Sequence, residues 1–244
     1  MPDRAPSLTL DELRLRRLRQ HTVAVPGRTA IFELTGQGAV DCLQGLLTND
    51  VSQPGPETVV HGALLTPKGM IVVDLWVLRL PSALVLVTPL EGREDAAEIF
   101  RKSFPPRLAK VTERTEEWTT VHLYGEETFA VLNRAELPVA PGEGQLVWAA
   151  EGDGDAVYIT ACPPAGAPFQ ALLLTPSLDA GTLLEVLQEA GAVIGDETDQ
   201  EAARLLAGWP GLGAEIDEKT LPQEVRFDEI GSVSYTKGCY LGQE

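Results

Sequence analysis

The feature that most constrains the fold is a set of three apolar runs that follow one another with only short breaks. The runs cover Val59–Thr66, Met70–Leu80 and Ala83–Thr88. The breaks, Pro67-Lys68-Gly69 and Pro81-Ser82, contain residues typical of tight turns, with Gly69 able to supply a positive φ. Strands joined by such short turns run antiparallel, because a parallel crossover needs a dozen or more residues. Residues Glu91–Ser103 then show helical spacing, which predicts a helix packed on the sheet.

A second block of the same kind follows. Strands are predicted at Trp118–Tyr124, Gln145–Ala150, Ala156–Ala161 and Phe169–Thr175, and helices at Glu126–Asn133, Leu178–Ala190 and Asp196–Ala207. Gly191 stands where a helix C′ residue is expected, and Thr198–Glu201 has the pattern of a capping box. Strands and helices mix without strict βαβ alternation, so the predicted class is α+β, with two related lobes of antiparallel sheet plus helices.

The charge of the chain limits its partners. The formal net charge is −17 over 244 residues, and a strongly anionic surface repels phosphate backbones. Direct nucleic-acid binding is therefore not expected. Five arginines do gather within the first 20 residues, and we interpret them as the solvated face of a short N-terminal helix that begins at a capping box, Thr9–Glu12.

The cysteines indicate a reducing compartment. Cys42, Cys162 and Cys239 are odd in number and far apart, which argues against a disulfide framework. The histidines and cysteines show no metal-ligand spacing, so no metal site is expected within the chain itself. No apolar run is long enough to span a membrane, and no signal peptide is visible. We expect a cytoplasmic protein that does not bind membranes.

The last eight residues, Lys237–Glu244, form the most specific motif. Their sequence is Lys-Gly-Cys-Tyr-Leu-Gly-Gln-Glu. A thiol reacts as its thiolate, and a neighbouring cation lowers the pKa of a thiol. Gly238 removes side-chain bulk beside the sulfur. These residues predict a reactive and approachable Cys239, whereas the competing interpretation is a cysteine that packs beneath the preceding loop.

This motif resembles the K-G-C-Y-x-G-Q-E signature of the YgfZ family of folate-binding proteins, which are relatives of the glycine-cleavage aminomethyltransferases. Other segments that resemble the family are Leu43–Val51 (L-Q-G-x-x-T-N-D-V in the family), Leu65–Gly69 leading to Asp74-Leu75, Leu221–Glu224 and Val233–Thr236. The resemblance extends from about Ala30 to the last residue.

The resemblance implies two α+β lobes around a central folate cavity, followed in the family by a C-terminal β-barrel. Because the chain stops at Glu244, we expect the barrel to be absent or truncated. The predicted organisation is an N-terminal arm or helix (1–28) and an aminomethyltransferase-like domain (29–244). Its lobes would cover roughly 29–115 and 116–200, and 201–244 would return to the cavity.

The resemblance also implies a function: binding of tetrahydrofolate or a related folate in support of the assembly or repair of iron–sulfur enzymes. The expected partners are an iron–sulfur scaffold or client enzymes. Cys239 would be the reactive thiol and a transient cluster ligand, and Lys237 would tune it. Gly238 and Gly242 would give backbone access. The residues expected to contact folate or fix the motif loop are Asp74, Asn49, Asp50, Tyr240, Gln243 and Glu244.

The chain departs from the family pattern at several positions. Val73 replaces the first acid of an Asp-Asp pair that the aminomethyltransferases carry, which weakens the case for aminomethyl transfer. Leu206 stands where an acid often precedes Ala-Gly, and leucine cannot bind pterin N–H groups. Thr29 and Gln200 stand where tryptophans stack on folate in some members.

Several alternatives stay open. Asp74 is either a ligand contact or a structural acid, because a carboxylate in an apolar strand needs a partner. Asn49-Asp50 is either a turn or a border of the cavity. At the level of function, the alternatives are a folate-dependent aminomethyl or one-carbon transferase, an indirect tRNA-modification factor, and a non-catalytic interaction module.

Overall fold

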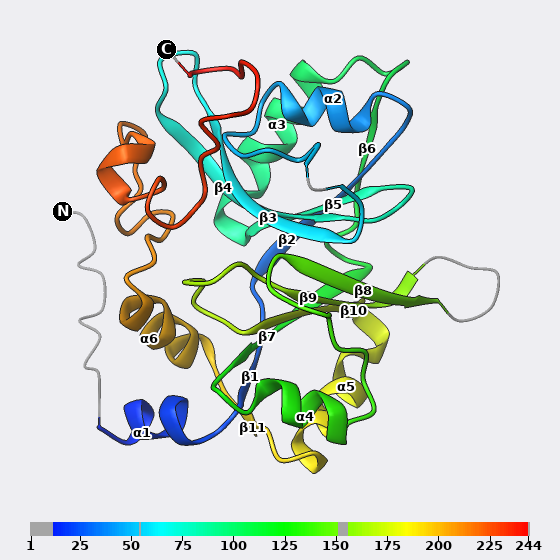
Figure 1. Ribbon diagram of the computed structural model, residues 1–244, viewed down its shortest axis with the longest axis vertical. Helices are drawn as coiled ribbons and strands as arrows, with labels where there is room; N and C mark the ends of the chain where they lie inside the picture. The colour runs from blue at the N-terminus through cyan, green and yellow to red at the C-terminus, as the bar shows by residue number, and fades with distance from the viewer. Residues whose placement is uncertain (1–11, 54, 151–155, 244) are drawn as a thin grey trace.

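The computed structural model describes residues 12–53, 55–150 and 156–243. Its strands form one 11-stranded sheet in the order β11-β1-β7-β10-β9-β8-β3-β4-β5-β2-β6 (Figure 1). The strands are β1 (Val23–Pro26), β2 (Thr29–Thr35), β3 (Thr58–Leu65), β4 (Ile71–Arg79), β5 (Leu84–Pro89), β6 (Lys110–Glu113), β7 (Trp118–Tyr124), β8 (Gln145–Ala150), β9 (Ala156–Cys162), β10 (Ala171–Pro176) and β11 (Val193–Ile194). All neighbouring strands pair antiparallel except β1 and β11, which pair parallel.

Six α-helices lie among the described residues and pack on this sheet. They are α1 (Glu12–Gln20), α2 (Ala39–Gln44), α3 (Arg93–Ser103), α4 (Thr128–Arg134), α5 (Ala180–Glu189) and α6 (Glu197–Ala207). Helices α2 and α3 cover the outer side of the half formed by β2–β6, and α4 and α5 cover the outer side of the other half (Figure 1). The predicted α+β class with two sheet-plus-helix lobes is confirmed.

The alternation of side chains along β4 explains how the two halves fit together. Val73, Leu75 and Val77 pack against α2 and α3 in the core of the first half. Asp74, Trp76 and Leu78 point to the opposite face, where Trp76 and Leu78 join a core shared with the second half. Both faces of β4 are therefore buried, and this explains why its sequence is an almost continuous apolar run.

The two halves of the sheet meet at one narrow junction. Strands β3 and β8 share a single registered pair, Thr58 and Gln145. Two backbone hydrogen bonds support it, from Val59 N to Gly144 O (2.8 Å) and from Leu146 N to Glu57 O (3.0 Å). Residues 23–26, which we assigned to the N-terminal arm, form β1 within the second half, where they pair with β7 and β11.

The helix starts differ in detail from the sequence-based expectation. Helix α6 begins at Glu197, and its N-cap is Asp196, whose carboxylate accepts from the backbone N–H groups of Thr198 (2.9 Å) and Asp199 (3.1 Å). The capping box thus pairs Asp196 with Asp199, and the prediction at Thr198–Glu201 was wrong. Asp196, two residues before Thr198, takes the N-cap position, because aspartate is among the strongest N-cap residues. The predicted box at Thr9–Glu12 lies outside the described residues except for Glu12.

The arginines of α1 are not simply a solvated face, which corrects that interpretation. Arg14 pairs with Asp196 (3.1 Å), and Arg17 pairs with the buried Asp199 (3.1 Å). These contacts fasten α1 to the start of α6. After α6, the chain crosses back to the first half, and its last described residues lie beside the β3–β4 hairpin (Figure 1). Among the described residues, no helix is long and apolar enough to cross a bilayer.

Candidate functional site

A cavity of about 330 Å³ opens between the inner faces of the two halves. Strands β4 and β5 form one wall, β7 and Phe169 form another, and α6 with the segment after it completes the lining. The aromatic lining residues are Trp76, Tyr124, Phe169 and Trp209, and the ionisable ones are Arg28, Asp74, Glu91, His122, Glu197, Glu201, Arg204 and Tyr124. A pocket of this size and mixed lining is typical of small-molecule sites.

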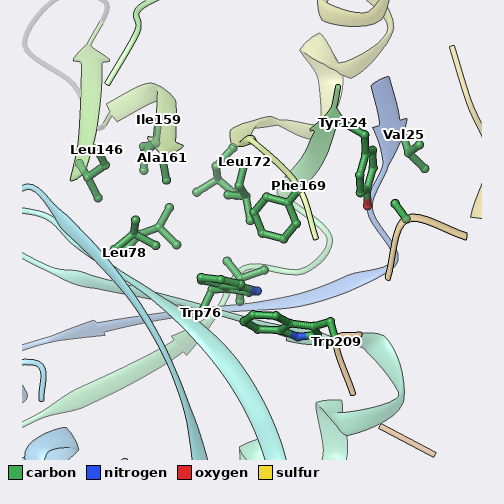
Figure 2. Close-up of a cluster of buried hydrophobic side chains, with 14 of the residues drawn as sticks. Val25, Trp76, Leu78, Tyr124, Leu146, Ile159, Ala161, Phe169, Leu172 and Trp209 are labelled. Atoms are coloured by element: carbon green, nitrogen blue, oxygen red, sulfur yellow. The ribbon is translucent and has the colours of Figure 1, made fainter. Parts of the chain in front are cut away.

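Two tryptophans form an aromatic wall. The rings of Trp76 and Trp209 stack at an interplanar angle of 15° with their centroids 5.6 Å apart. The Phe169 ring meets Trp76 edge-on at 5.1 Å, as Figure 2 shows. Both tryptophans are more than nine-tenths buried. Their π-faces and edges suit a planar ligand ring.

Asp74 places a carboxylate in the largely apolar interior between the two halves. Its side chain is buried, and its Oδ2 lies 3.0 Å from Nε2 of His61. The second ring nitrogen of His61, Nδ1, lies 2.6 Å from the hydroxyl of Ser232. Oδ1 of Asp74 has no hydrogen-bond partner within the described part of the chain. A buried carboxylate oxygen without a partner is costly, so it is a natural contact point for a ligand donor.

The charges around the cavity are largely paired with one another. Arg204 hydrogen-bonds Glu201 (2.5 Å) and Glu215 (2.7 Å), and these bonds raise the pKa of its guanidinium. Arg28 lies near Glu197 (3.3 Å) and Glu91 (3.6 Å). Arg28 and Arg204 therefore line the cavity as members of arginine–carboxylate pairs and not as isolated positive charges.

His122 lies on the wall opposite Asp74, on β7. It is 4% exposed, and burial lowers its pKa from 6.5 to about 4. The ring is therefore neutral at neutral pH. Its Nδ1 has no partner among the described residues. Each of these two walls thus contributes a residue with a buried polar atom that has no partner among the described residues.

The motif segment, residues 237–243, is anchored away from this cavity. Nζ of Lys237 donates to the carbonyl oxygens of Gln44 (2.7 Å), Leu47 (2.7 Å) and Asn49 (2.9 Å), which engages all three of its donors. Burial lowers the pKa of this lysine to about 8. Its ammonium also lies 5.0 Å from the centroid of the Tyr240 ring. Lys237 therefore clamps the segment onto the loop after α2.

The rest of the segment packs on the β3–β4 hairpin. The Leu241 amide donates to Gly45 O (3.0 Å). Gly242 has φ +82°, and a Cβ there would lie 2.4 Å from the Thr66 carbonyl oxygen, so glycine is required. The Gln243 side chain lies 3.4 Å from the Tyr240 amide. Glu244 lies outside the described residues.

The three cysteines differ in exposure. Cys239 is exposed at the surface of the motif segment, Cys42 is half-buried and Cys162 is buried at the end of β9. Burial raises the pKa of the Cys42 and Cys162 thiols. Within the described residues no cluster of histidine, cysteine and acidic side chains could hold a metal ion.

The structure separates the residues that we predicted to share one site. Asp74 lines the cavity, whereas Asn49, Asp50, Tyr240 and Gln243 are not among its lining residues. The Asn49 amide donates to the carbonyls of His61 and Gly231, both at 2.8 Å. Asp50 closes a turn by accepting from Ser52 and Gln53. Asp50 thus has the contacts of a turn residue, whereas the Asn49 amide joins β3 to the C-terminal segment. Tuning of Cys239 by Lys237 stays a prediction.

Sequence reasoning missed most of the cavity. Leu206 is about half exposed and is not among the lining residues. The residue type at position 206 therefore does not determine whether the cavity contains an acidic side chain. Glu197, Glu201 and Arg204 of the same helix do line the cavity. Their spacing of four and three residues is the helical signal that could have identified them. Trp76 could have been found from Asp74, because residues two apart on a strand share a face.

The fold and cavity define an α+β aminomethyltransferase-like protein. The structure matches that of the glycine cleavage system aminomethyltransferase T from Bartonella henselae with a TM-score of 0.72 at 20% sequence identity. The match covers 90% of this chain and 63% of that one. A family model described as the GCVT N-terminal domain matches residues 27–158. The chain belongs to this family.

Curated relatives have three kinds of name. An aminomethyltransferase from Rubrobacter xylanophilus is 27% identical, over 82% of this chain and 56% of its own length. A tRNA-modifying protein YgfZ from Colwellia psychrerythraea is 24% identical, over 87% of this chain and 62% of its own. A mitochondrial iron–sulfur cluster assembly factor IBA57 homolog from Phaeosphaeria nodorum is 25% identical, over 90% of this chain and 50% of its own. The chain thus spans about half to two thirds of the length of these relatives.

Proposed function

We propose that this protein binds a reduced folate in the cavity between the two halves and supports the assembly or repair of iron–sulfur enzymes. The observation that carries the proposal is Asp74, a buried acid that lines an aromatic-walled cavity and whose Oδ1 has no hydrogen-bond partner among the described residues. A pterin ring is planar and has N–H donors, so stacking on the tryptophan wall and donation to Asp74 suit it. Arg28 at the cavity rim is a candidate partner for the anionic glutamate tail.

The iron–sulfur part of the proposal rests on other observations. Relatives of this chain include a protein named as an iron–sulfur cluster assembly factor. Cys239 is exposed on an anchored segment, so its sulfur is accessible to a partner-held cluster. The expected partners are therefore scaffold or client enzymes and not nucleic acid, given the net charge of −17. The free cysteines fit a reducing compartment such as the cytoplasm.

Calorimetric titration with tetrahydrofolate tests the binding proposal. We expect one-site binding to the wild-type protein and a loss of roughly tenfold to 100-fold in affinity in Asp74→Asn, because a hydrogen bond to a charged acceptor is removed. Asp41→Asn is the matched control, since Asp41 is an exposed acid on α2. Absence of binding to the wild-type protein would contradict the proposal.

Complementation tests the role of the thiol. In a strain that lacks this protein, Cys239→Ser is expected to leave iron–sulfur enzyme activity unrestored, whereas Cys42→Ser restores it. Cys42 is a suitable control because its half-buried side chain packs beside the core of the first half. Full restoration by Cys239→Ser would remove the thiol from the mechanism while leaving folate binding untouched.

A folate-dependent one-carbon transferase is the second candidate. The relative from Rubrobacter xylanophilus is named an aminomethyltransferase, and Asp74 offers one acid to the cavity. Val73 points away from the cavity into the core of the first half, so only one of the two adjacent positions faces a ligand. Turnover of tetrahydrofolate with an aminomethylated lipoyl-carrier substrate, lost in Asp74→Asn, would support this alternative over the first.

A further inference from the structure

Three polar side chains form a buried relay that ends at the cavity. Ser232 Oγ lies 2.6 Å from His61 Nδ1, and His61 Nε2 lies 3.0 Å from Asp74 Oδ2. Ser232 is fully buried, His61 is 2% exposed and Asp74 is 7% exposed. The three residues come from the C-terminal segment, β3 and β4. Burying three polar side chains in an apolar interior costs folding free energy unless their polar atoms form hydrogen bonds.

The hydrogen-bonding capacities determine the direction of the relay. An ionised carboxylate only accepts, so His61 donates to Asp74 through Nε2–H. In a neutral ring Nδ1 is then an acceptor, and the Ser232 hydroxyl donates a hydrogen bond to it. The relay therefore fixes one tautomer of His61 and uses Oδ2 of Asp74. Oδ1 is the carboxylate oxygen that has no hydrogen-bond partner among the described residues.

The geometry excludes the alternative that Ser232 is a nucleophile. A nucleophilic serine must face the substrate, whereas Ser232 is fully buried and is not among the cavity residues. The carboxylate is instead the member that lines the cavity. Ser232 and His61 thus orient the Asp74 carboxylate, and Asp74 is the member of the relay that can contact a ligand.

The two members of the relay that support Asp74 are held in place. The His61 ring is enclosed by Trp76, Trp209 and Phe227, with ring centroids 4.7, 4.8 and 5.6 Å away. Ser232 is fixed by a hydrogen bond from its amide to Phe227 O (2.7 Å) and by one from Thr48 Oγ1 to its carbonyl (2.7 Å). The Asn49 amide joins the His61 and Gly231 carbonyls. The Asp74 carboxylate consequently has one supported orientation.

We propose that His61 and Ser232 are positioning residues that hold Asp74 as an oriented acceptor, so that the cavity selects the amino-pyrimidine edge of a reduced pterin. This inference rests on the proposed folate binding and names the group that is recognised. A ring with a carbonyl oxygen in place of that amino group would place two acceptors against each other. Such a mismatch leaves buried polar groups unpaired, which discriminates strongly.

The test measures the ratio of the affinities for two ligands and not the affinity for one ligand alone. Tetrahydropterin and its 2-oxo analogue, tetrahydrolumazine, are titrated anaerobically into the wild-type protein and folded variants. We expect the wild-type protein to prefer tetrahydropterin by about tenfold or more. In His61→Phe, which keeps an aromatic ring, the preference should fall close to equality. His61→Gln, whose amide can donate to Asp74, should retain part of it, and Ser232→Ala should lower it by a smaller factor.

The outcomes separate this inference from the proposed function. An unchanged preference in both His61→Phe and Ser232→Ala, with tetrahydropterin still bound, would overturn the positioning role and leave folate binding standing. No binding of tetrahydropterin by the wild-type protein would overturn both. His21→Phe and Ser234→Ala are matched controls, because His21 is exposed and Ser234 lies two residues beyond the relay. Ser232→Ala decides the question if His61→Phe does not fold.

Discussion

The cavity and the motif segment differ in almost every physical respect. The cavity is lined by side chains from four strands, a helix and the segments beside them, many residues apart in sequence, and its aromatic wall is buried. The motif segment is one continuous stretch whose backbone is fastened by Lys237 and whose cysteine faces solvent. The first arrangement suits a ligand enclosed by the protein, and the second suits contact with another molecule. The comparison indicates two separate tasks on one fold.

The two regions are nevertheless connected through the C-terminal segment. Ser232 belongs to the relay that ends at Asp74, and Lys237 follows five residues later. Asn49 contacts the carbonyl of Gly231, while its own carbonyl accepts from Lys237. Changes that disturb one region and spare the other would establish that their tasks are separable.

The largest effect is expected from Trp209→Ala. Trp209 is 7% exposed and stacks on Trp76, so its removal leaves a cavity in the shared core that costs about 3–5 kcal/mol of unfolding free energy. Chemical denaturation measures this loss. Trp148→Ala is the control, because Trp148 is 41% exposed on β8 and should cost much less. Equal losses in the two variants would contradict the enclosed character of the cavity.

An acid-dependent loss of stability is expected from His122. Its pKa is about 4 in the folded protein and 6.5 when unperturbed, so between these values the unfolded state binds the extra proton. Stability should therefore fall as the pH is lowered from about 6.5 to 4, by up to about 3 kcal/mol from this group. His122→Gln should show a shallower fall in denaturation midpoint over that range. Identical pH profiles would show that His122 is protonated or exposed in solution.

The fold was predictable because its signals are local. The three runs from Val59 to Thr88 correspond to β3, β4 and β5, and their breaks correspond to observed turns, with Gly69 at φ +84°. Apolar periodicity and turn chemistry act over a few residues, so one sequence is enough to read them. The capping of α6 by Asp196 was missed because two overlapping acidic patterns compete there.

The site was predictable only where it is contiguous. Lys237–Gln243 was recognised as one unit, and the structure shows it as one anchored segment. The relay and the aromatic wall combine His61, Trp209 and Ser232, which no short pattern links. These residues come together because β3 pairs antiparallel with β4 and because the chain returns to the first half after α6. The periodicity of a short segment does not show which residues from distant parts of the sequence will meet in the fold.

A smaller and local effect is expected from Lys237→Met. The variant removes three hydrogen bonds from an ammonium group and leaves three carbonyls without that donor, which should weaken docking of the segment by about 2–3 kcal/mol. The Leu241 amide, bonded to Gly45 O, should exchange with solvent roughly 30-fold faster or more. Lys68→Met, at the exposed hairpin tip, is the control. Equally accelerated exchange around the cavity would mean that the two regions are not separable.

The smallest contrast is between the two motif glycines. At Gly242 a methyl group would lie 2.4 Å from Thr66 O, and φ is +82°. Gly242→Ala should therefore destabilise the docked segment by about 1–2 kcal/mol. A Cβ at Gly238 would meet no atom of the described residues within 4 Å, so Gly238→Ala should change stability by no more than about 0.5 kcal/mol.

Hydrogen exchange at Leu241 measures both glycine variants on the same amide. If Gly238→Ala also impairs iron–sulfur enzyme activity in the complementation strain while exchange at Leu241 stays unchanged, the open space beside Cys239 is needed for access of a partner and not for docking of the segment. Faster exchange in both variants would instead assign Gly238 a structural role. Cys239 would then depend on the same anchoring as the rest of the segment.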